Sequence, residues 1–486
     1  MKNIVHLLVV TLLFVACEDA LEEAPVDQIA REAFYTSADD AQAAIFAVYD
    51  PLRNTDYYGA RLLGHLEVLA EYANGRGSYR PVSEYQGLDA VNTGRTENMW
   101  QQMYSSINRA NAVIGNVPSI VMDETEKNAI VAEAHFLRAL NYYNLVRGWG
   151  GVPLRTEETI DLSNQAAPRA TVDQVYELIV DDLEIAERGL PAEQDEIGRA
   201  TQWAAKTLLA EVYLTREQWD LSRDKAQEVI SSNQFTLVAV QEPDDFSNLF
   251  GPEIISSSEE IFSLKYTRVD GQGFWFLSFI HLVQAGYSAA GFRVVLGIPD
   301  LPFYTEWDDN DLRKEHTIYT SYVDAQGDSI PLPDNEPMLF RKFRDPEGVS
   351  PVGHGNDFPV LRYADALLIY AEAASQASGG PTAEAYGAIN QIRRRAYGLD
   401  ASTSAPSVDL SGLDAATFRD AVLQERAREF VAEGRRWWDL KRTGRARAVI
   451  EATGKEFNDI MLLWPIPLAE IDNNPAISSE DQNPGY

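Results

Sequence analysis

The spacing of apolar residues in the first half of the chain predicts long helices. Between residues 128 and 148, apolar side chains recur three and four positions apart, which predicts one apolar stripe along a helix. The glycine-rich segment at residues 148–153 ends this helix. A second helix is predicted between Thr171, a suitable N-cap, and Gly189, a suitable C-cap. The stripe comprises Ala129, Ala132, Phe136, Ala139, Tyr143 and Val146.

Two further segments have the pattern of antiparallel helix pairs. The first covers residues 198–232 with a joint near Glu217, and the second covers residues 362–396 with a joint at Gly379, Gly380 and Pro381. Small alanines opposite Leu and Tyr allow two helices to pack closely, as in a tetratricopeptide unit. The fold predicted from these patterns is mainly α, with tetratricopeptide-like helix pairs.

The segment between these pairs, residues 236–360, has a different composition. Gly, Pro, Asp and aromatic residues are frequent there, and the helical period fades. Alternating apolar residues in EEIFSLKYTRV, residues 259–269, predict a short strand. We therefore expect an irregular, loop-rich insert that contains short β-strands, and such inserts are where binding groups usually lie. No Ser-, Pro- or Gly-rich linker separates residues 27–235 from residues 236–486, so both regions are expected to form one body.

The amino terminus has the pattern of a secretory signal. Lys2 precedes an apolar run at residues 4–16, which is shorter than the ~20 apolar residues that span a membrane. The segment LLFVAC ends at Cys17 and resembles the box that closes bacterial lipoprotein signals, although Phe14 stands where Leu is usual. This resemblance implies a signal peptide at residues 1–16, acylation of Cys17 and a lipidated tether at residues 17–26.

Two alternatives remain open at this terminus. An ordinary signal peptide can contain a cysteine by chance. The acidic residues that follow Cys17 resemble a signal for export to the cell surface in lipoproteins of Bacteroidetes-type bacteria, but they also suit a solvated tether.

Composition and charge limit the classes of function that the chain can have. The 486 residues are 45% apolar, which allows a substantial core, and carry a formal net charge of −33. Nucleic acid is a poor partner for such a chain, because a phosphate backbone requires a basic face. One cysteine excludes an internal disulfide and a cysteine-based metal cluster, and the six histidines lack ligand spacing. We expect neither a metal nor a cofactor.

An ordered set of segments resembles the SusD/RagB family of nutrient-uptake lipoproteins. The set spans nearly the whole mature chain. Its members are GRTENMWQQMYSSINRANAVI (94–114), EAHFLRALNYYNLVRGWGGVPL (133–154), GRATQWAAKTLLAEVYL (198–214), FPVLRYADALLIYAEA (358–373), AINQIRRRA (388–396), ERAREFVAEGRRWWDLKRTG (425–444), LLWPIPLAEIDNNP (462–475) and QNPGY (482–486).

The resemblance implies a mostly helical fold built on four tetratricopeptide-like pairs. It also implies a place on the outer face of the outer membrane, beside a TonB-dependent, SusC-like barrel. Such proteins capture glycans, or peptides in some members, and no enzymatic activity is expected. Trp307 lies in a segment that matches a framework feature of the family, so we expect it to be structural.

Three glutamates spaced four residues apart raise the alternative of a glycoside hydrolase. Glu425, Glu429 and Glu433 would share a helical face, and two of them would act as acid and nucleophile. Arg428 and Arg436 follow within pairing distance, however, and a carboxylate beside Arg stays ionised. We interpret these glutamates as structural. The acidic segment 308–311 lacks the Gly and final Glu of an EF-hand and is interpreted as a solvated turn.

Two aromatic-rich segments are the candidates for ligand binding. Residues 71–85 and residues 271–292 combine aromatic rings with polar side chains. An aromatic ring can cover the apolar face of a sugar, while Asn and Arg bond its hydroxyl groups. Phe276 and Phe279 are expected in the core, and core burial is also an open alternative for Trp275 and Tyr79. The predicted ligand-binding residues are Asn74, Arg76, Tyr79, Tyr85, Trp275 and Tyr287.

The leading hypothesis is therefore a surface lipoprotein that binds an oligosaccharide and passes it to a transporter barrel. A peptide ligand is the first alternative, a secreted glycoside hydrolase the second, and a tetratricopeptide scaffold without a small ligand the third.

Overall fold

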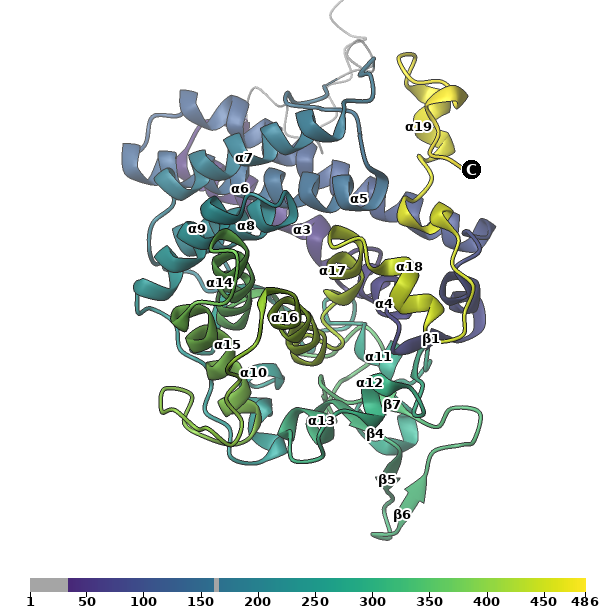
Figure 1. Ribbon diagram of the computed structural model, residues 1–486. Coiled ribbons are helices and arrows are strands. Elements are labelled where there is room, and N and C mark those ends of the chain that lie inside the picture. The colour runs from purple at the N-terminus through teal and green to yellow at the C-terminus, as the bar shows by residue number, and fades with distance from the viewer. Residues whose placement is uncertain (1–33, 161–165) are drawn as a thin grey trace, which may run out of the picture.

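A computed structural model describes residues 34–160 and 166–486 of the protein (Figure 1). The predicted signal peptide (1–16), the acylated Cys17 and the tether (17–26) lie outside the described residues, as do residues 27–33 of the predicted N-terminal region. Within the described part of the chain, no helix combines the length and apolar character that crossing a membrane requires.

The first half of the described chain is a stack of helices. Each of α5 to α8 packs against the next helix in sequence, and α3 packs against α5 and α6 (Figure 1). The prediction of long helices is confirmed, and so is the helix pair with its joint near Glu217. The helices are α3 (Ala38–Arg53), α4 (Arg61–Val68), α5 (Ala90–Asn116), α6 (Glu124–Trp149), α7 (Val172–Gly189), α8 (Gln202–Thr215) and α9 (Trp219–Ser231).

Helix α6 is buried on all sides rather than along one stripe. From Ala132 to Trp149, every residue except Arg147 is buried. The predicted helical period is correct, but the prediction of a single apolar stripe is wrong. The reason is that α3, α5 and α7 all pack against α6, so that no face of its second half meets water.

The ends of α7 follow the predicted signals with one shift. Thr171 is the N-cap, as expected, but Gly189 is the last helical residue and Leu190 is the C-cap. A Cβ atom on Gly189 would lie 2.6 Å from the Cβ atom of Ala132. The glycine therefore serves the close approach of α6 and α7 rather than a left-handed turn.

A second helix pair closes the stack. Helices α14 (Tyr363–Ala377) and α15 (Ala383–Ala396) are joined at Gly379–Pro381, as predicted, and α14 packs against α9 and α8. Residues far apart in sequence thus continue the same helical layer (Figure 1). The remaining helices of the described second half are α10 (Ser247–Phe250), α11 (Leu277–Ile280), α12 (Pro302–Thr305), α13 (Leu312–Thr317), α16 (Ala415–Glu429), α17 (Arg436–Arg442), α18 (Ala446–Glu451) and α19 (Leu468–Asn473).

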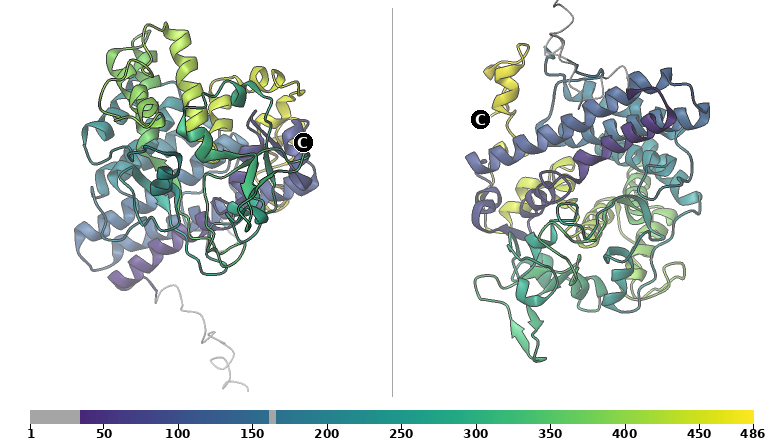
Figure 2. Two further views of the ribbon diagram at one scale, coloured as in Figure 1. Left: turned by 90° about the horizontal axis from the view of Figure 1, so that it is seen from below. Right: turned by 180° about the vertical axis from the view of Figure 1, so that it is seen from behind.

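The insert contains short β-strands, as expected, and they form antiparallel pairs, one of them with β1 from the first half of the chain. The pairs are β1–β3, β2–β8, β4–β7 and β5–β6, and the β5–β6 hairpin projects from the body (Figure 2). The strand expected in residues 259–269 is β2. The strands are β1 (Ala73–Gly75), β2 (Glu260–Leu264), β3 (Val295–Gly297), β4 (Ile318–Tyr319), β5 (Ser321–Val323), β6 (Ser329–Pro331), β7 (Leu339–Phe340) and β8 (Phe358–Arg362).

Candidate functional site

The two predicted ligand-binding segments meet at the β1–β3 ribbon. Asn74 lies opposite Leu296, and the Arg76 amide donates to the Val294 carbonyl at 2.8 Å. The Arg76 side chain donates to the carbonyl of Phe292, 216 residues later in sequence, at 3.3 Å. Segments 71–85 and 271–292 are therefore neighbours, on the side of the molecule where Figure 1 labels α4, β1 and α11.

Aromatic and polar side chains adjoin one another beside this ribbon. The Arg61 guanidinium lies 5.8 Å from the centroid of the half-buried Trp275 ring and pairs with Asp56. The Trp275 ring meets the Phe292 ring nearly at right angles, with centroids 6.2 Å apart, and Phe292 is 46% exposed. We name this group the Trp275 surface; it consists of Asp56, Arg61, Arg76, Asn98, Trp275 and Phe292.

The polar members border the rings. The Asn98 Nδ2 atom donates to Asp56 at 3.4 Å, and Arg76 pairs with Glu336 at 2.8 Å. Trp275 Nε1 has no hydrogen-bond partner within the described residues. An accessible apolar ring next to guanidinium, carboxylate and amide groups matches the chemistry of a sugar, which has an apolar face and hydroxyl edges.

Two of the predicted ligand-binding tyrosines are buried. Tyr79 is 3% exposed, and the Arg95 guanidinium covers its ring 3.9 Å from the centroid. Tyr85 is 0% exposed, and its hydroxyl donates to the Leu69 carbonyl at 3.1 Å. The prediction that these two rings form an open platform is wrong. Tyr79 lies three residues before the buried Val82 in the 3₁₀ turn at Gly77–Glu84, which aligns these two positions on one inward face, whereas Tyr85 follows the turn as its C-cap with a left-handed backbone (φ 56°).

The other predicted residues are divided between two places. Asn74 is half-buried and lies on β1, and Arg76 is exposed and directly follows β1. Tyr287 instead belongs to a smaller apolar cluster, where its ring contacts Tyr319 at 5.4 Å and His281 at 5.6 Å. The structure thus brings Arg76 to Phe292 beside Trp275, places Asn74 on strand β1 and leaves Tyr287 apart. Phe276 and Phe279 are buried in the main core, as expected.

Four members of the Trp275 surface were not predicted from the sequence: Asp56, Arg61, Asn98 and Phe292. Asp56 and Arg61 flank the start of α4, and Asn98 lies within the long helix α5. No periodicity connects these positions. Only the packing of α4 and α5 near the β1–β3 ribbon brings them to Trp275. Phe292, by contrast, is the last residue of the predicted segment 271–292, so its place in an aromatic-rich segment could have indicated a role in binding.

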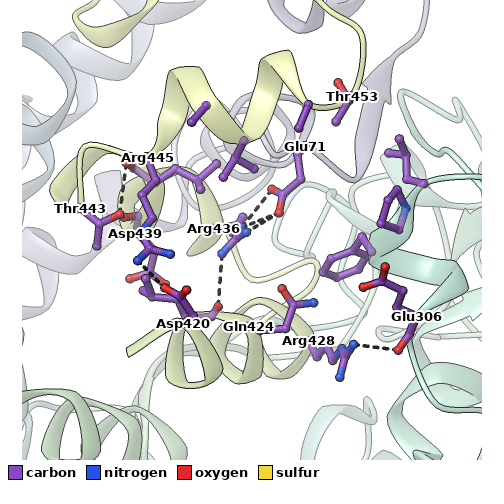
Figure 3. Close-up of a pocket in the computed structure, with 18 residues that line it drawn as sticks. Glu71, Glu306, Asp420, Gln424, Arg428, Arg436, Asp439, Thr443, Arg445 and Thr453 are labelled. Carbon is purple, nitrogen blue, oxygen red and sulfur yellow. Dashed lines mark hydrogen bonds and ion pairs between the residues drawn. The ribbon is translucent and has the colours of Figure 1, made fainter. Parts of the chain in front are cut away.

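A larger recess lies between α12, α16 and α18 (Figure 3). Its volume is about 720 Å³, and ion pairs occupy many of its polar groups: Arg436 pairs with Glu71, and Arg445 with Asp420. Phe303 is the one aromatic residue among those that line the recess, and it is only 6% exposed. Because it offers no accessible ring, this recess is a weaker match to a sugar than the Trp275 surface is.

The three glutamates of the hydrolase alternative lie in a buried ionic cluster. Each is 2–3% exposed. Their expected partners were wrong: Arg428 donates to the Glu306 carbonyl, and Arg436 pairs with Glu71. The reason is that Glu425 and Glu429 of α16, and Glu433 in the turn that follows this helix, face inward, toward cations from other elements. The pairs are Arg313–Glu425, Arg393–Glu425, Arg313–Glu429, Arg362–Glu429, Arg395–Glu429, Arg362–Glu433 and Lys342–Glu433.

These contacts keep the central carboxylate ionised. Burial raises the pKa of Glu429, but the guanidinium groups of Arg395 and Arg362 outweigh it and hold the pKa well below its usual range. A general acid must carry a proton near neutral pH. Glu429 therefore has the wrong charge state for the acid of a glycosidase, and its interpretation as a structural residue fits its surroundings.

The segment 308–311 is only partly a solvated turn. Asp308 is exposed, but Asp311 is 1% exposed, caps α13 and pairs with Arg313 at 2.7 Å. Within residues 34–160 and 166–486, no group of three or more His, Cys, Asp or Glu is arranged to hold a metal ion. Trp307 is 1% exposed and structural, as expected.

Comparison with known sequences defines the class. A family profile described as the SusD family matches residues 299–486, and one described as "Starch-binding associating with outer membrane" matches residues 65–214. SusD-like protein P2 of Formosa agariphila is 30% identical over 519 aligned positions, which cover 100% of both chains. The chain belongs to the SusD family, and the predicted resemblance is confirmed.

Solved structures agree with this assignment. A SusD homologue from Bacteroides thetaiotaomicron has a TM-score of 0.81 at 23% identity, covering 94% of this chain and 98% of that one, which shows the shared fold. A laminarin-binding SusD-like protein has a TM-score of 0.74 at 26% identity, covering 93% and 100%. The predicted mainly α fold is thereby confirmed.

Proposed function

We propose that this protein captures glycans at the Trp275 surface and delivers them to a TonB-dependent, SusC-like barrel in the outer membrane. Membership of the SusD family supports glycan binding, as does the laminarin-binding relative. The family description that names association with the outer membrane supports the location. Acylation of Cys17 would supply the anchor that holds the protein at the outer face of the membrane.

The observation that carries the proposal is the exposed ring of Phe292 beside Trp275. The two rings offer an apolar platform, and Arg61 lies against the Trp275 ring. Asp56, paired with Arg61, and Asn98, which donates to Asp56, add hydrogen-bond acceptors and donors to this polar group. Such a surface favours a sugar ring that lies flat on the aromatic group and is held at its edges. The proposed mechanism is binding without bond cleavage.

A pair of matched variants tests this site. Phe292→Ala removes the exposed ring, while Phe46→Ala removes a ring of similar exposure, 44%, on α3. We expect Phe292→Ala to weaken binding of laminarin oligosaccharides or maltooligosaccharides at least tenfold, about 1.4 kcal/mol, and Phe46→Ala to leave it unchanged. Isothermal titration calorimetry with each oligosaccharide series measures both effects.

Three outcomes would refute parts of the proposal. Equal affinity of both variants and the unaltered protein would move the site away from the Trp275 surface. Binding of peptides but of no oligosaccharide would favour the peptide-uptake alternative. Release of new reducing ends from a glycan by the purified protein would establish a hydrolase.

A further inference from the structure

A second, smaller recess lies at the carboxyl end of α6, where α7, α8, α16 and α17 meet. Its volume is about 270 Å³. It differs from the recess in Figure 3, although Asp439 lines both. Residues from all five of these helices line it.

The lining is cationic in a strongly acidic protein. Five basic side chains line the recess, against the two carboxylates of Glu211 and Asp439, whereas the whole chain carries a net charge of −33. The four guanidinium groups are matched by four carboxylates, two of which lie behind the lining. The pairs are Arg147–Glu211, Arg435–Glu211, Arg435–Asp365, Arg426–Asp439, Arg442–Asp439 and Arg442–Glu372.

Lys441 is the basic residue of the recess that takes part in none of these ion pairs. Within the described part of the chain, no carboxylate lies at ion-pair distance from its ammonium group. Nζ donates one hydrogen bond to the Arg147 carbonyl and lies 5.2 Å from the centroid of the Trp438 ring. An ammonium group has three N–H donors, so further bonds can be directed into the recess. Burial lowers the pKa of Lys441 to about 7, and Arg147 adds to this effect.

Arg426 provides a second unmet donor at the same recess. Its side chain is 3% exposed, and Nε donates to Asp439 at 2.8 Å. Its Nη1 atom has no hydrogen-bond partner within residues 34–160 and 166–486. A buried guanidinium N–H without a partner is unfavourable, because the group has lost its hydration without replacement.

We propose that this recess binds a small monoanion through a carboxylate group. One uncompensated positive charge and unmet N–H donors call for one negative charge with acceptor oxygens, and a carboxylate meets both needs. The apolar walls formed by Tyr176, Val172 and Leu463 suit a ligand whose remainder is compact and weakly polar. Either a free small acid or an acidic sugar unit supplies this chemistry. The inference does not depend on glycan binding at the Trp275 surface.

Titration with defined anions tests the proposal. Sodium acetate represents the free acid, sodium glucuronate represents the acidic sugar, and glucose is the neutral match to glucuronate. Sodium chloride at equal ionic strength gives the reference for non-specific screening. Calorimetry at pH 6.5 is expected to show saturable binding of acetate or glucuronate and none of glucose. Equal affinities would identify the free acid as the source, and tenfold tighter glucuronate would identify the sugar.

The chain offers a closely matched control lysine. Lys455 is also half-buried, donates to a backbone carbonyl, that of Ala73, and lies 5.2 Å from an aromatic ring, that of Tyr85. Lys441→Met is expected to weaken anion binding at least tenfold, while Lys455→Met leaves it unchanged. Thermal unfolding of both variants verifies that each is folded. Equal binding by Lys441→Met, or no saturable binding of either anion to the unaltered protein, would overturn the proposal.

The pH dependence of the unaltered protein provides a test without mutation. Affinity is expected to fall from pH 6 to pH 9, because Lys441 loses its proton in this range while the arginines remain charged. Constant affinity across this range would also overturn the proposal. The charged and titratable groups that line the recess with Lys441 are Arg147, Arg426, Arg435, Arg442, Glu211, Asp439, Tyr143 and Tyr176.

Discussion

The carboxylate of Asp439 is held between two buried guanidinium groups. Its side chain is 3% exposed, and it accepts hydrogen bonds from Arg426 at 2.8 Å and Arg442 at 2.9 Å. Burial alone would raise the pKa of Asp439, but the two arginines have the larger effect and lower the pKa to about 2. A carboxylate with a lower pKa in the folded state stabilises the protein at pH values above its unfolded-state pKa. This contribution is lost as the pH falls through the folded-state pKa. At 1.36 kcal/mol per pKa unit, the contribution is about 2 kcal/mol.

Replacing this one carboxylate should therefore have a pH-dependent effect. Asp439→Asn is expected to lower the free energy of unfolding at pH 7 by about 2 kcal/mol or more, because it leaves the buried Arg426 without its carboxylate partner and Arg442 with Glu372 alone. The difference from the unaltered protein should shrink between pH 4 and pH 2, where Asp439 takes up a proton in both states. Urea unfolding at several pH values measures the difference.

An exposed aspartate provides the control. Asp220→Asn alters a carboxylate with 74% exposure that pairs with Arg223, and it should change stability by less than ~0.5 kcal/mol. A difference for Asp439→Asn that persists undiminished at pH 2 would contradict the assigned ionisation.

At the scale of single residues, the sequence predicted the type of residue that would neutralise a glutamate better than it predicted which particular residue would do so. It indicated that Glu425 and Glu433 would be neutralised by arginine, but the arginines predicted for this role, three residues later, were wrong. Local spacing describes only contacts within a helix, whereas Glu429 meets Arg362 and Arg395 from elements formed elsewhere in the chain. The same limit explains why Arg61 was not connected with Trp275 before the fold was known.

Among the elements, the start of α7 can be tested by itself. Thr171 accepts a hydrogen bond from the Gln174 amide, and the Gln174 side chain accepts one from the Thr171 amide, which completes a capping box. Thr171→Ala is expected to lower the free energy of unfolding by about 1 kcal/mol, because a helix amide loses its acceptor. Thermal or urea unfolding measures the loss.

The next helix supplies a matched control for this cap. Thr201 is the N-cap of α8 but makes no side-chain capping bond, and its hydroxyl has no partner within the described residues. Thr201→Ala should therefore cost less than Thr171→Ala. If both substitutions cost the same, the side-chain hydrogen bond would not be the source of the effect.

Whole elements were the most predictable part of this fold. Helical periodicity located the pair α8–α9, periodicity with Gly and Pro at the joint located the pair α14–α15, and alternating apolar residues located the strand β2. The packing of α14 against α9 was not predictable from these signals, since the intervening insert carries no periodicity that records it. The inward face of the 3₁₀ turn at Gly77–Glu84 was missed, because a spacing of three was not recognised in so short a segment.

For the whole molecule, the end of the chain is fixed to the centre of its first half. The Trp464 amide donates to the Gly148 carbonyl at 2.8 Å, and its ring meets the Trp149 ring edge-on at 4.8 Å. Asn483 donates to the carbonyls of Trp149 and Trp464 at 2.9 Å and 2.6 Å. A Cβ atom on Gly148 would lie 2.9 Å from the Trp464 ring, so the glycine permits this contact. Together these contacts fasten the carboxyl-terminal tail to the end of α6.

Removing this ring should destabilise the whole protein rather than loosen only its tail. Trp464 is 1% exposed and also contacts Trp438 and His65, so Trp464→Ala leaves a cavity between α6, α17 and α4. The expected loss in the free energy of unfolding is about 3–5 kcal/mol. Leu468→Ala, on the same tail but 67% exposed, should change it by less than ~0.5 kcal/mol. Urea unfolding measures both variants.

Hydrogen exchange then separates a global effect from a local one. If the tail belongs to the cooperative unit, amides of α6 will exchange faster in Trp464→Ala by the factor that the measured loss of stability predicts, because their exchange requires the same unfolding. If only amides after residue 452 accelerate while α6 keeps its protection, the tail is a separately opening segment. Its contacts with Gly148 and Trp149 would then contribute nothing to the stability of the helical stack.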